Sequence, residues 1–330
     1  MVWTTEKANN WYKNKGWIVG FNYVTSNAIN STEMWQSETF DPDTIQKELK
    51  IASQIGFNSC RVFLQYLVWE NEQAQFIKNF DTFLEIAEKH NITVMPILFD
   101  DCAFSNKEPY LGKQLEPTFG IHNSGWTPSP GFLIADNNDY SNKLEAYLKT
   151  IVNTYKDDSR IIAWDLYNEP GNSGRNEKCL NLLLKSFDWA RECNPSQPLT
   201  SGIWVWKDFD LKCVDLSDVI SFHDYKTLDI TKERIENLKQ YSRPMFCTEW
   251  LHRIEGNSIE THMRFFKANN IAIYNWGLVE GKTQTNLSWN KEENLQNGQP
   301  EIWQHDILRS DLTPYIPEEV TFIKSITSTK

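Results

Sequence analysis

Short apolar runs alternate with longer amphipathic segments along most of the chain. The apolar runs are rich in β-branched and aromatic residues, as buried strands are, and they lie at 17–24, 58–65, 92–100, 160–169, 198–206, 219–225, 244–250 and 271–279. The segments between them have helical periodicity. The pattern therefore predicts eight repeats of a strand followed by a helix.

The ends of some helices can be predicted from single residues. Asp41 can cap a helix whose first turn holds Pro42, and Gly56 can end it. A second helix is predicted over 79–90, with one apolar face made of Phe80, Phe83, Leu84 and Ala87. The eighth helix is expected at 303–310 or at 317–326.

The eight repeats have no Gly/Ser linker and no break in composition between them. They predict an α/β fold, a single (β/α)8 TIM barrel forming one catalytic domain over residues 1–330. A doubly wound sheet would be the alternative, but the G-x-G-x-x-G turn that such a fold carries after its first strand is missing. Residues 102–139 form a long loop after the third strand, rich in Pro, Gly and Asn. We expect this loop at the C-terminal face of the barrel, with a disordered surface insertion as the alternative.

Charge and composition exclude several classes of partner. The 33 basic and 44 acidic residues give a net charge of −11, which argues against nucleic acid or an anionic membrane as a partner. The first residues contain no secretory apolar run and no stretch is apolar enough to span a membrane, so a cytoplasmic protein is expected unless a signal peptide was removed. The six cysteines form no C-x-x-C pair and are expected to be reduced structural thiols.

No cofactor and no metal ion is predicted. The six histidines show no H-E-x-x-H spacing. The segment GLVEGKT at 277–283 is similar to a phosphate-binding loop, but it has three residues between its glycines where that loop has four. We expect it instead to bring Glu280, Lys282 and Gln284 over a substrate.

Two of the predicted strands end in a glutamate. The fourth ends in Asn168-Glu169-Pro170, and the seventh ends in Thr248-Glu249-Trp250. The two strands are nearly opposite in an eight-stranded barrel, so their carboxyl groups can face each other across its mouth. Retaining glycosidases use two carboxyl groups about 5–5.5 Å apart, one to protonate the leaving oxygen and one to attack the anomeric carbon.

The segments WDLYNEP and FCTEW resemble the two catalytic strands of the clan A glycoside hydrolases, and further residues resemble family 5. The resemblance covers about residues 16–280 and implies that Glu169 is the acid/base and Glu249 the nucleophile. It also implies substrate-binding roles for Arg61, Asn168, His223, Tyr225 and Trp276. One departure is Asp100-Asp101, at or near the place where many relatives have a histidine. These two aspartates are therefore candidates for the sugar contacts there.

The expected chemistry separates the two glutamates by their pKa values. Strand alternation points Arg61 into the mouth, where its positive charge would favour an ionised Glu249. Glu169 must instead be protonated at rest, through burial or the nearby charge of Glu249.

Tryptophan is as frequent as glycine, with 14 residues of each type. An indole ring can cover the C–H face of a sugar while its N–H still donates a hydrogen bond. Besides Trp276, the candidates for such platforms at the barrel mouth are Trp126, Trp204, Trp206 and Trp250.

The sequence therefore predicts a retaining β-glycosidase whose partner is an oligosaccharide or a β-linked polysaccharide. Exo action on short β-mannosides is expected, and an endo-β-1,4-glucanase or endo-β-1,4-mannanase is the alternative. A non-hydrolytic carbohydrate-binding barrel and a transglycosylase also stay open. The sequence makes no prediction of the oligomeric state.

Overall fold

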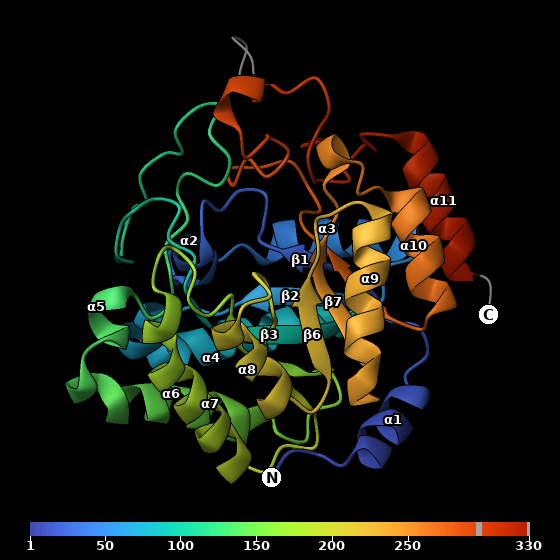
Figure 1. The fold of residues 1–330 in the computed structure, drawn as a ribbon. Coiled ribbons are helices and arrows are strands. Elements are labelled where there is room, and N and C mark those ends of the chain that lie inside the picture. Colours follow the sequence, from blue (N-terminus) through green and yellow to red (C-terminus); the bar gives the residue numbers. More distant parts are fainter. Residues whose placement is uncertain (295–298, 329–330) are drawn as a thin grey trace.

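Eight parallel strands form a barrel surrounded by helices in the computed structural model, which describes residues 1–294 and 299–328 (Figure 1). Each strand lies within one of the predicted apolar runs, and the predicted (β/α)8 TIM barrel is confirmed. The strands are β1 Val19–Tyr23, β2 Ser59–Phe63, β3 Thr93–Asp100, β4 Trp164–Asn168, β5 Leu199–Thr200, β6 Ile220–His223, β7 Met245–Trp250 and β8 Ala272–Asn275. The hydrogen-bonded order is β5-β4-β3-β2-β1-β8-β7-β6, and a bridge between Ile203 and Phe222 joins the segment after β5 to β6.

Helices follow most strands. They are α1 Thr5–Lys13, α2 Ser31–Trp35, α3 Pro42–Ile55, α4 Tyr66–Lys89, α5 Phe132–Ala135, α6 Ser141–Tyr155, α7 Leu180–Glu192, α8 Asp208–Leu216, α9 Leu228–Leu238, α10 Ile259–Ala268 and α11 Pro317–Ser328. As predicted, Asp41 caps α3 and Gly56 ends it in the left-handed conformation at φ 112°. The helix predicted over 79–90 is the second half of α4, which begins at Tyr66 and has non-helical dihedral angles at Glu72. Of the two places expected for the eighth helix, 317–326 is helical and 303–310 is not.

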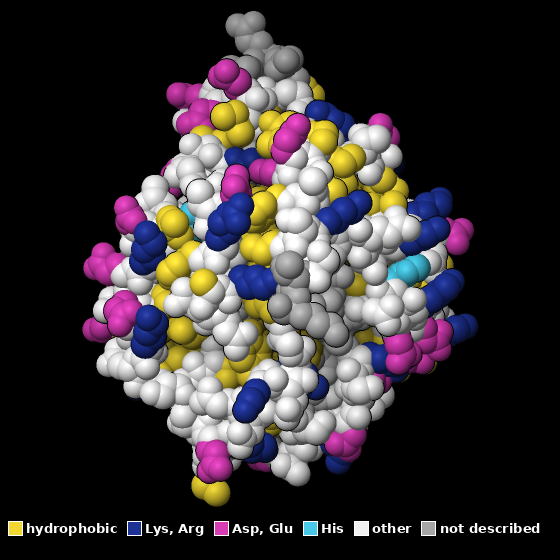
Figure 2. All heavy atoms as spheres, turned by 90° about the vertical axis from the view of Figure 1, so that its right-hand side faces the viewer, with side chains coloured by type: hydrophobic (Ala, Val, Ile, Leu, Met, Phe, Trp, Pro, Cys, Tyr) yellow, Lys and Arg dark blue, Asp and Glu magenta, His cyan; other side chains and the backbone are white. Residues whose placement is uncertain are grey.

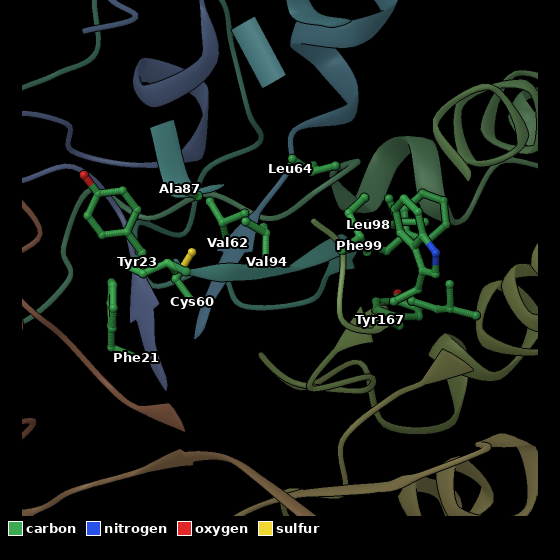
Figure 3. Packing of buried hydrophobic residues seen from close by; sticks show 14 of the residues in the cluster. Phe21, Tyr23, Cys60, Val62, Leu64, Ala87, Val94, Leu98, Phe99 and Tyr167 are labelled. Carbon is green, nitrogen blue, oxygen red and sulfur yellow. The ribbon is translucent and has the colours of Figure 1, made fainter. Parts of the chain in front are cut away.

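Side chains alternate between the two faces of each strand. Cys60 and Val62 of β2 point outward and pack with Val94 of β3 and Ala87 of α4 (Figure 3). Arg61, between them in the sequence, points into the barrel, where it contacts β4 and β7. The apolar layer under the helices thereby fixes which polar side chains face the interior.

A second apolar cluster fills the N-terminal end of the barrel. Tyr274 and Phe246 point inward there, and Tyr12 of α1 covers them with its ring 5.5 Å from that of Phe246. Gly20 is required beside Tyr274, because a Cβ atom at this position would lie 2.3 Å from the tyrosine ring. Since α1 closes this end, the C-terminal ends of the strands are left for a site.

The outer surface mixes charges of both signs. On the face that carries α10 and α11, lysine and arginine side chains lie among aspartates and glutamates (Figure 2). Among the described residues, no helix combines the length and the apolar character needed to pass through a bilayer.

Candidate active site

A cavity of about 570 Å³ opens at the C-terminal ends of the strands. Glu169, which directly follows β4, and Glu249 on β7 both line it. One carboxylate oxygen of each glutamate and one ring nitrogen of His223 all lie within 4.8 Å of one another. The structure thus brings together the two glutamates that the sequence placed on opposite strands.

His223 of β6 lies between the two glutamates. Its Nδ1 is 2.8 Å from Oε1 of Glu169 and 3.4 Å from Oε2 of Glu249. Burial lowers the pKa of His223 to about 4, so the ring is neutral at neutral pH. A neutral imidazole can donate from Nδ1 to an ionised Glu169 or accept there from a protonated one. The contact therefore suits both protonation states of Glu169.

Arg61 connects Glu249 to the barrel interior. Its Nη1 donates to Oε1 of Glu249 at 2.8 Å and to Oδ1 of Asn22 at 2.7 Å. Its Nε and Nη2 both donate to Oδ2 of Asp165, at 2.9 Å and 2.8 Å. The guanidinium is fully buried, and these partners hold it in one orientation beside Glu249.

The second oxygen of Glu249 has its own donor. The hydroxyl of Tyr225 donates to Oε2 of Glu249 at 2.7 Å. Burial and the neighbouring carboxylates raise the pKa of Tyr225 well above its usual value, so the phenol keeps its proton. Glu249 is thus held at both oxygens.

Asn168 links the two halves of the site. Its Oδ1 accepts from Nη2 of Arg61 at 2.6 Å, and its Nδ2 donates to Oδ1 of Asp100 at 2.8 Å. Asp100 also accepts from the indole N–H of Trp126 at 2.7 Å. Burial raises the pKa of Asp100 to about 7.

Glu169 sits in an unusual backbone conformation. Its φ is 41°, in the left-handed region that side-chain-bearing residues seldom adopt. Its Oε2 accepts a hydrogen bond from the thiol of Cys102 at 3.2 Å and another from Nδ2 of Asn172. Strained backbone of this kind is found preferentially at functional sites.

In the structure, the pKa values of Glu169 and Glu249 are both raised. The sequence analysis had instead predicted that their surroundings would push the two pKa values in opposite directions. Burial is the largest cause for each. The groups that oppose the rise differ. For Glu249, the interaction with His223, the charge of Arg61 and the hydrogen bond from Tyr225 lower the pKa. For Glu169, the hydrogen bonds from Cys102 and Asn172 come first, and the charge of Arg61 follows them.

Residues 112–298 match the family model described as the TIM barrel domain of glycosyl hydrolases family 2. The chain belongs to this family. A curated relative, mannan endo-1,4-beta-mannosidase F of Aspergillus clavatus, is 25% identical to this chain over 134 residues. That match covers 40% of the chain and only 28% of the relative's length.

Solved structures share the fold of this chain at low identity. The exo-beta-1,4-mannosidase Op5Man5 from Opitutaceae bacterium strain TAV5 has a TM-score of 0.63 and 15% identity, over 94% of this chain and 59% of that one. GH5_18 from Streptomyces cattleya, solved with Manβ1-4GlcNAc, has a TM-score of 0.62 and 14% identity over 94% and 80%. A glycoside hydrolase family 5 mannosidase from Rhizomucor miehei has a TM-score of 0.61 and 14% identity over 94% and 92%. The expected resemblance to glycoside hydrolases is confirmed, and family 5, which the motifs indicated, is represented among these structures.

Three of the five candidate tryptophan platforms line the cavity. They are Trp126, Trp204 and Trp276. The other two, Trp206 and Trp250, are not among the described residues that line it. Trp250 follows the inward-pointing Glu249, so alternation turns it outward against Phe266, with ring centroids 5.5 Å apart. Trp206 packs against Phe222, and the guanidinium of Arg234 lies over its ring.

The predicted polar contacts near the third strand lie behind the cavity wall. Asp100 and Asp101 are 3% and 1% exposed, and neither is among the described residues that line the cavity. Asp101 turns away from Asp100, forms an ion pair with Arg175 at 2.9 Å and accepts a hydrogen bond from the hydroxyl of Tyr167 at 2.7 Å. Both aspartates thus stabilise loops and neighbouring side chains.

The loop after β8 does not carry its charges to the substrate space. Among the described residues, Glu280 and Lys282 are absent from the cavity lining. Glu280 accepts from the backbone of Ser310 at 3.4 Å, and Lys282 pairs with Glu33 at 3.5 Å. Gln284 donates instead to backbone carbonyls of the loop after β3.

Several lining residues were missed by the sequence analysis. Trp289 is 49% exposed, donates to Nε2 of His122 at 3.2 Å and has its ring 4.9 Å from that of Tyr225. Cys102 contacts Glu169 directly. Trp289 lies in a loop, where no periodicity predicts the direction of a side chain. Only its residue type and its position after the last strand could have suggested a place at the cavity.

The cluster of Glu169, His223 and Glu249 also has the spacing of metal ligands. Glu249 already accepts hydrogen bonds from Arg61 and Tyr225, one at each oxygen. A cation would have to compete with the buried guanidinium for that carboxylate. These hydrogen bonds make the cluster a poorer cation site than its spacing alone suggests.

Proposed function

We propose that the protein is a retaining, exo-acting β-mannosidase that cleaves short β-mannosides. The observation that carries the proposal is the pair of glutamates whose nearest oxygens are within 4.8 Å. Inverting glycosidases separate their carboxyl groups by about 6.5–9.5 Å to hold a water between them, and retaining ones by about 5–5.5 Å. The spacing therefore favours direct attack by a carboxylate.

The contacts of the two glutamates suggest which one attacks. Glu249 has the guanidinium of Arg61 at 2.8 Å, and this positive charge favours its ionised form. It attacks the anomeric carbon while Glu169 gives its proton to the leaving oxygen. In the second step Glu169 takes a proton from water, and the water oxygen displaces Glu249 from the sugar.

A wall on one side of the cavity supports exo action. The wall consists of segments 118–123 and 283–294, which come from the loops after β3 and β8. Both segments lie in the upper part of Figure 1. They are joined by hydrogen bonds from Asn123 N to Thr283 O at 2.8 Å, from Gln284 Nε2 to Thr118 O at 2.9 Å, from His122 Nδ1 to Leu287 O at 2.8 Å and from Asn294 Nδ2 to Gly120 O at 3.0 Å. A joined wall would stop a long chain from passing through.

The choice of mannose is supported by the relatives. The curated relative is named as a mannan endo-mannosidase, and two of the structures with the same fold are named as mannosidases. A neutral sugar also suits a cavity in which Trp126, Trp204 and Trp276 supply aromatic faces.

An endo-β-1,4-mannanase is the second candidate. Phe104 and Trp289, 47% and 49% exposed, extend the lining outward at the rim. Exposed aromatic rings beyond the reacting pair would suit additional sugar units of a longer chain.

Product analysis separates these candidates. We expect mannose as the first product from β-1,4-mannotriose and mannotetraose, and a β-configured first product by proton NMR. A mixture of oligomers would support the endo candidate, and an α-configured first product would overturn the retaining mechanism. Glu249→Gln, with its fold checked by circular dichroism, should have no turnover, and Glu255→Gln on the surface is the matched control.

A further inference from the structure

Cys102 follows β3 and lies against the glutamate that ends β4. Its Sγ is 3.2 Å from Oε2 of Glu169 and 3.5 Å from Nδ2 of Asn168, and it lines the cavity. We propose that Cys102 is a positioning residue for the acid/base: its S–H donates to Oε2 of Glu169, holds the carboxyl group in place and stabilises its ionised form. The inference rests on the proposed role of Glu169 in glycoside cleavage.

The backbone around Cys102 is fixed by two neighbours. Its N–H donates to Oδ1 of Asp100 at 3.0 Å, and the N–H of Ala103 donates to Oγ of Ser173 at 3.0 Å. Asp100 belongs to β3, and Ser173 lies in the loop that follows Glu169. The thiol is therefore held between the C-terminal end of β3 and the loop that follows β4.

The thiol keeps its proton over the range in which the site would work. Cys102 is 5% exposed, and burial together with the charges of Asp100 and Glu169 raises its pKa well above the usual value. A neutral thiol can donate to a carboxylate, whereas a thiolate could only repel it. Cys102 is thus a permanent donor rather than a nucleophile.

The donor matters most in the second half of the reaction. After the first step Glu169 has lost its proton to the leaving group and must stay ionised until water arrives. Cys102 and Asn172 then hold Oε2, while Oε1 faces His223. Titratable groups from several elements surround Glu169. They are Cys102 after β3, His223 on β6, Glu249 on β7 and Arg61 on β2. The charge of Asp210 on α8 also raises the pKa of Glu169.

The pKa of Glu169 itself can be measured without substrate. In protein labelled with ¹³C at the glutamate carboxyl groups, the Glu169 signal is assigned by its loss in Glu169→Gln and titrated by NMR. We expect Cys102→Ala to raise the pKa of Glu169 by about 0.5 unit, which corresponds to the loss of one weak S–H hydrogen bond to the ionised carboxylate. Cys102→Ser keeps a donor and should stay near the wild type. An unchanged pKa in Cys102→Ala, or an equal rise in both variants, would overturn the inference.

Kinetics test the same contact during turnover. The basic limb of kcat/KM on an aryl β-mannoside should move to higher pH in Cys102→Ala and not in Cys102→Ser. Cys193→Ala is the matched control and should keep the wild-type profile, because Cys193 directly follows α7 and is not among the described residues that line the cavity. A basic limb that does not move in an active Cys102→Ala protein contradicts the inference. A wild type without glycosidase activity would instead overturn the proposed function, while the NMR titration still decides the contact.

Discussion

At the residue scale, the site depends on how each glutamate is contacted. Arg61 and Tyr225 each donate to one oxygen of Glu249, whereas Cys102 and Asn172 both donate to the same oxygen of Glu169. Two carboxyl groups of the same type, both deeply buried, are thereby given different surroundings. Under the proposed mechanism, the difference separates a nucleophile from an acid/base.

Removing the acid/base should leave the nucleophile usable. Glu169→Ala should lose about a hundred- to ten-thousandfold in kcat on substrates with poor leaving groups. On an aryl β-mannoside with a good leaving group, added azide should restore turnover, because a small anion fits the vacated space and needs no proton removed. The measurement is the yield of β-mannosyl azide, with Glu177→Ala on the surface as control. No azide product at any concentration would contradict the assignment of Glu169.

Tyr225 should control the ionisation of Glu249. Its hydrogen bond lowers the pKa of Glu249, so Tyr225→Phe raises that pKa. The nucleophile must be ionised, and the acidic limb of kcat/KM should therefore move to higher pH by about one unit, as expected for one bond to a charged acceptor. Tyr241→Phe, outside the cavity lining, should leave the pH profile unchanged. An unmoved acidic limb in Tyr225→Phe would show that the bond does not act on Glu249.

At the element scale, the sequence predicted the strands better than the loops. Each strand lies within a predicted run, because burial on both faces demands continuous apolar residues. Alternation along β2 places Arg61 inside the barrel, whereas Phe246 and Glu249 of β7 both face inward because the register of β7 shifts between Cys247 and Trp250. Trp250 was expected as a platform, but it directly follows the inward-pointing Glu249, faces outward and is not among the described residues that line the cavity. Glu280 and Lys282 were expected over the substrate but lie elsewhere. A loop has no regular alternation from which the direction of a side chain can be predicted.

The wall is an element whose integrity can be tested by removing two of its hydrogen bonds. Gln284 donates to Thr118 O at 2.9 Å and to Ile121 O at 3.1 Å. Gln284→Ala should raise KM for mannobiose roughly fivefold, which corresponds to about 1 kcal/mol of lost loop stability. Gln240→Ala removes a comparable surface bond to Asn237 and serves as control. A KM equal to that of the wild type would mean that these bonds do not hold the wall in place.

At the scale of the whole molecule, buried carboxyl groups affect stability as well as chemistry. Asp306 accepts from Thr285 at 3.1 Å and 3.0 Å, and burial raises its pKa to about 7. A raised pKa in the folded state means that folding takes up a proton. The stability that Asp306 contributes is complete below its unfolded pKa, near 4, and is lost as the pH rises to about 7.

Asp306→Asn should remove this pH dependence. The free energy of unfolding of the wild type, measured relative to that of the variant by urea denaturation, should fall by on the order of 3 kcal/mol between pH 4 and pH 8. Asp229→Asn, at an exposed side chain, should show no such change relative to the wild type. A constant difference between wild type and Asp306→Asn across this range would mean that the pKa of Asp306 is not raised.

The central claim is that Glu249 attacks the sugar and forms a covalent intermediate. A 2-fluoro β-mannoside with a good leaving group should inactivate the protein by slowing the second step, and mass spectrometry of the digested protein should place one fluoromannosyl group on Glu249. Glu249→Gln should acquire no label. A label on another carboxyl group, or steady turnover with an α-configured product and no label, would contradict the account.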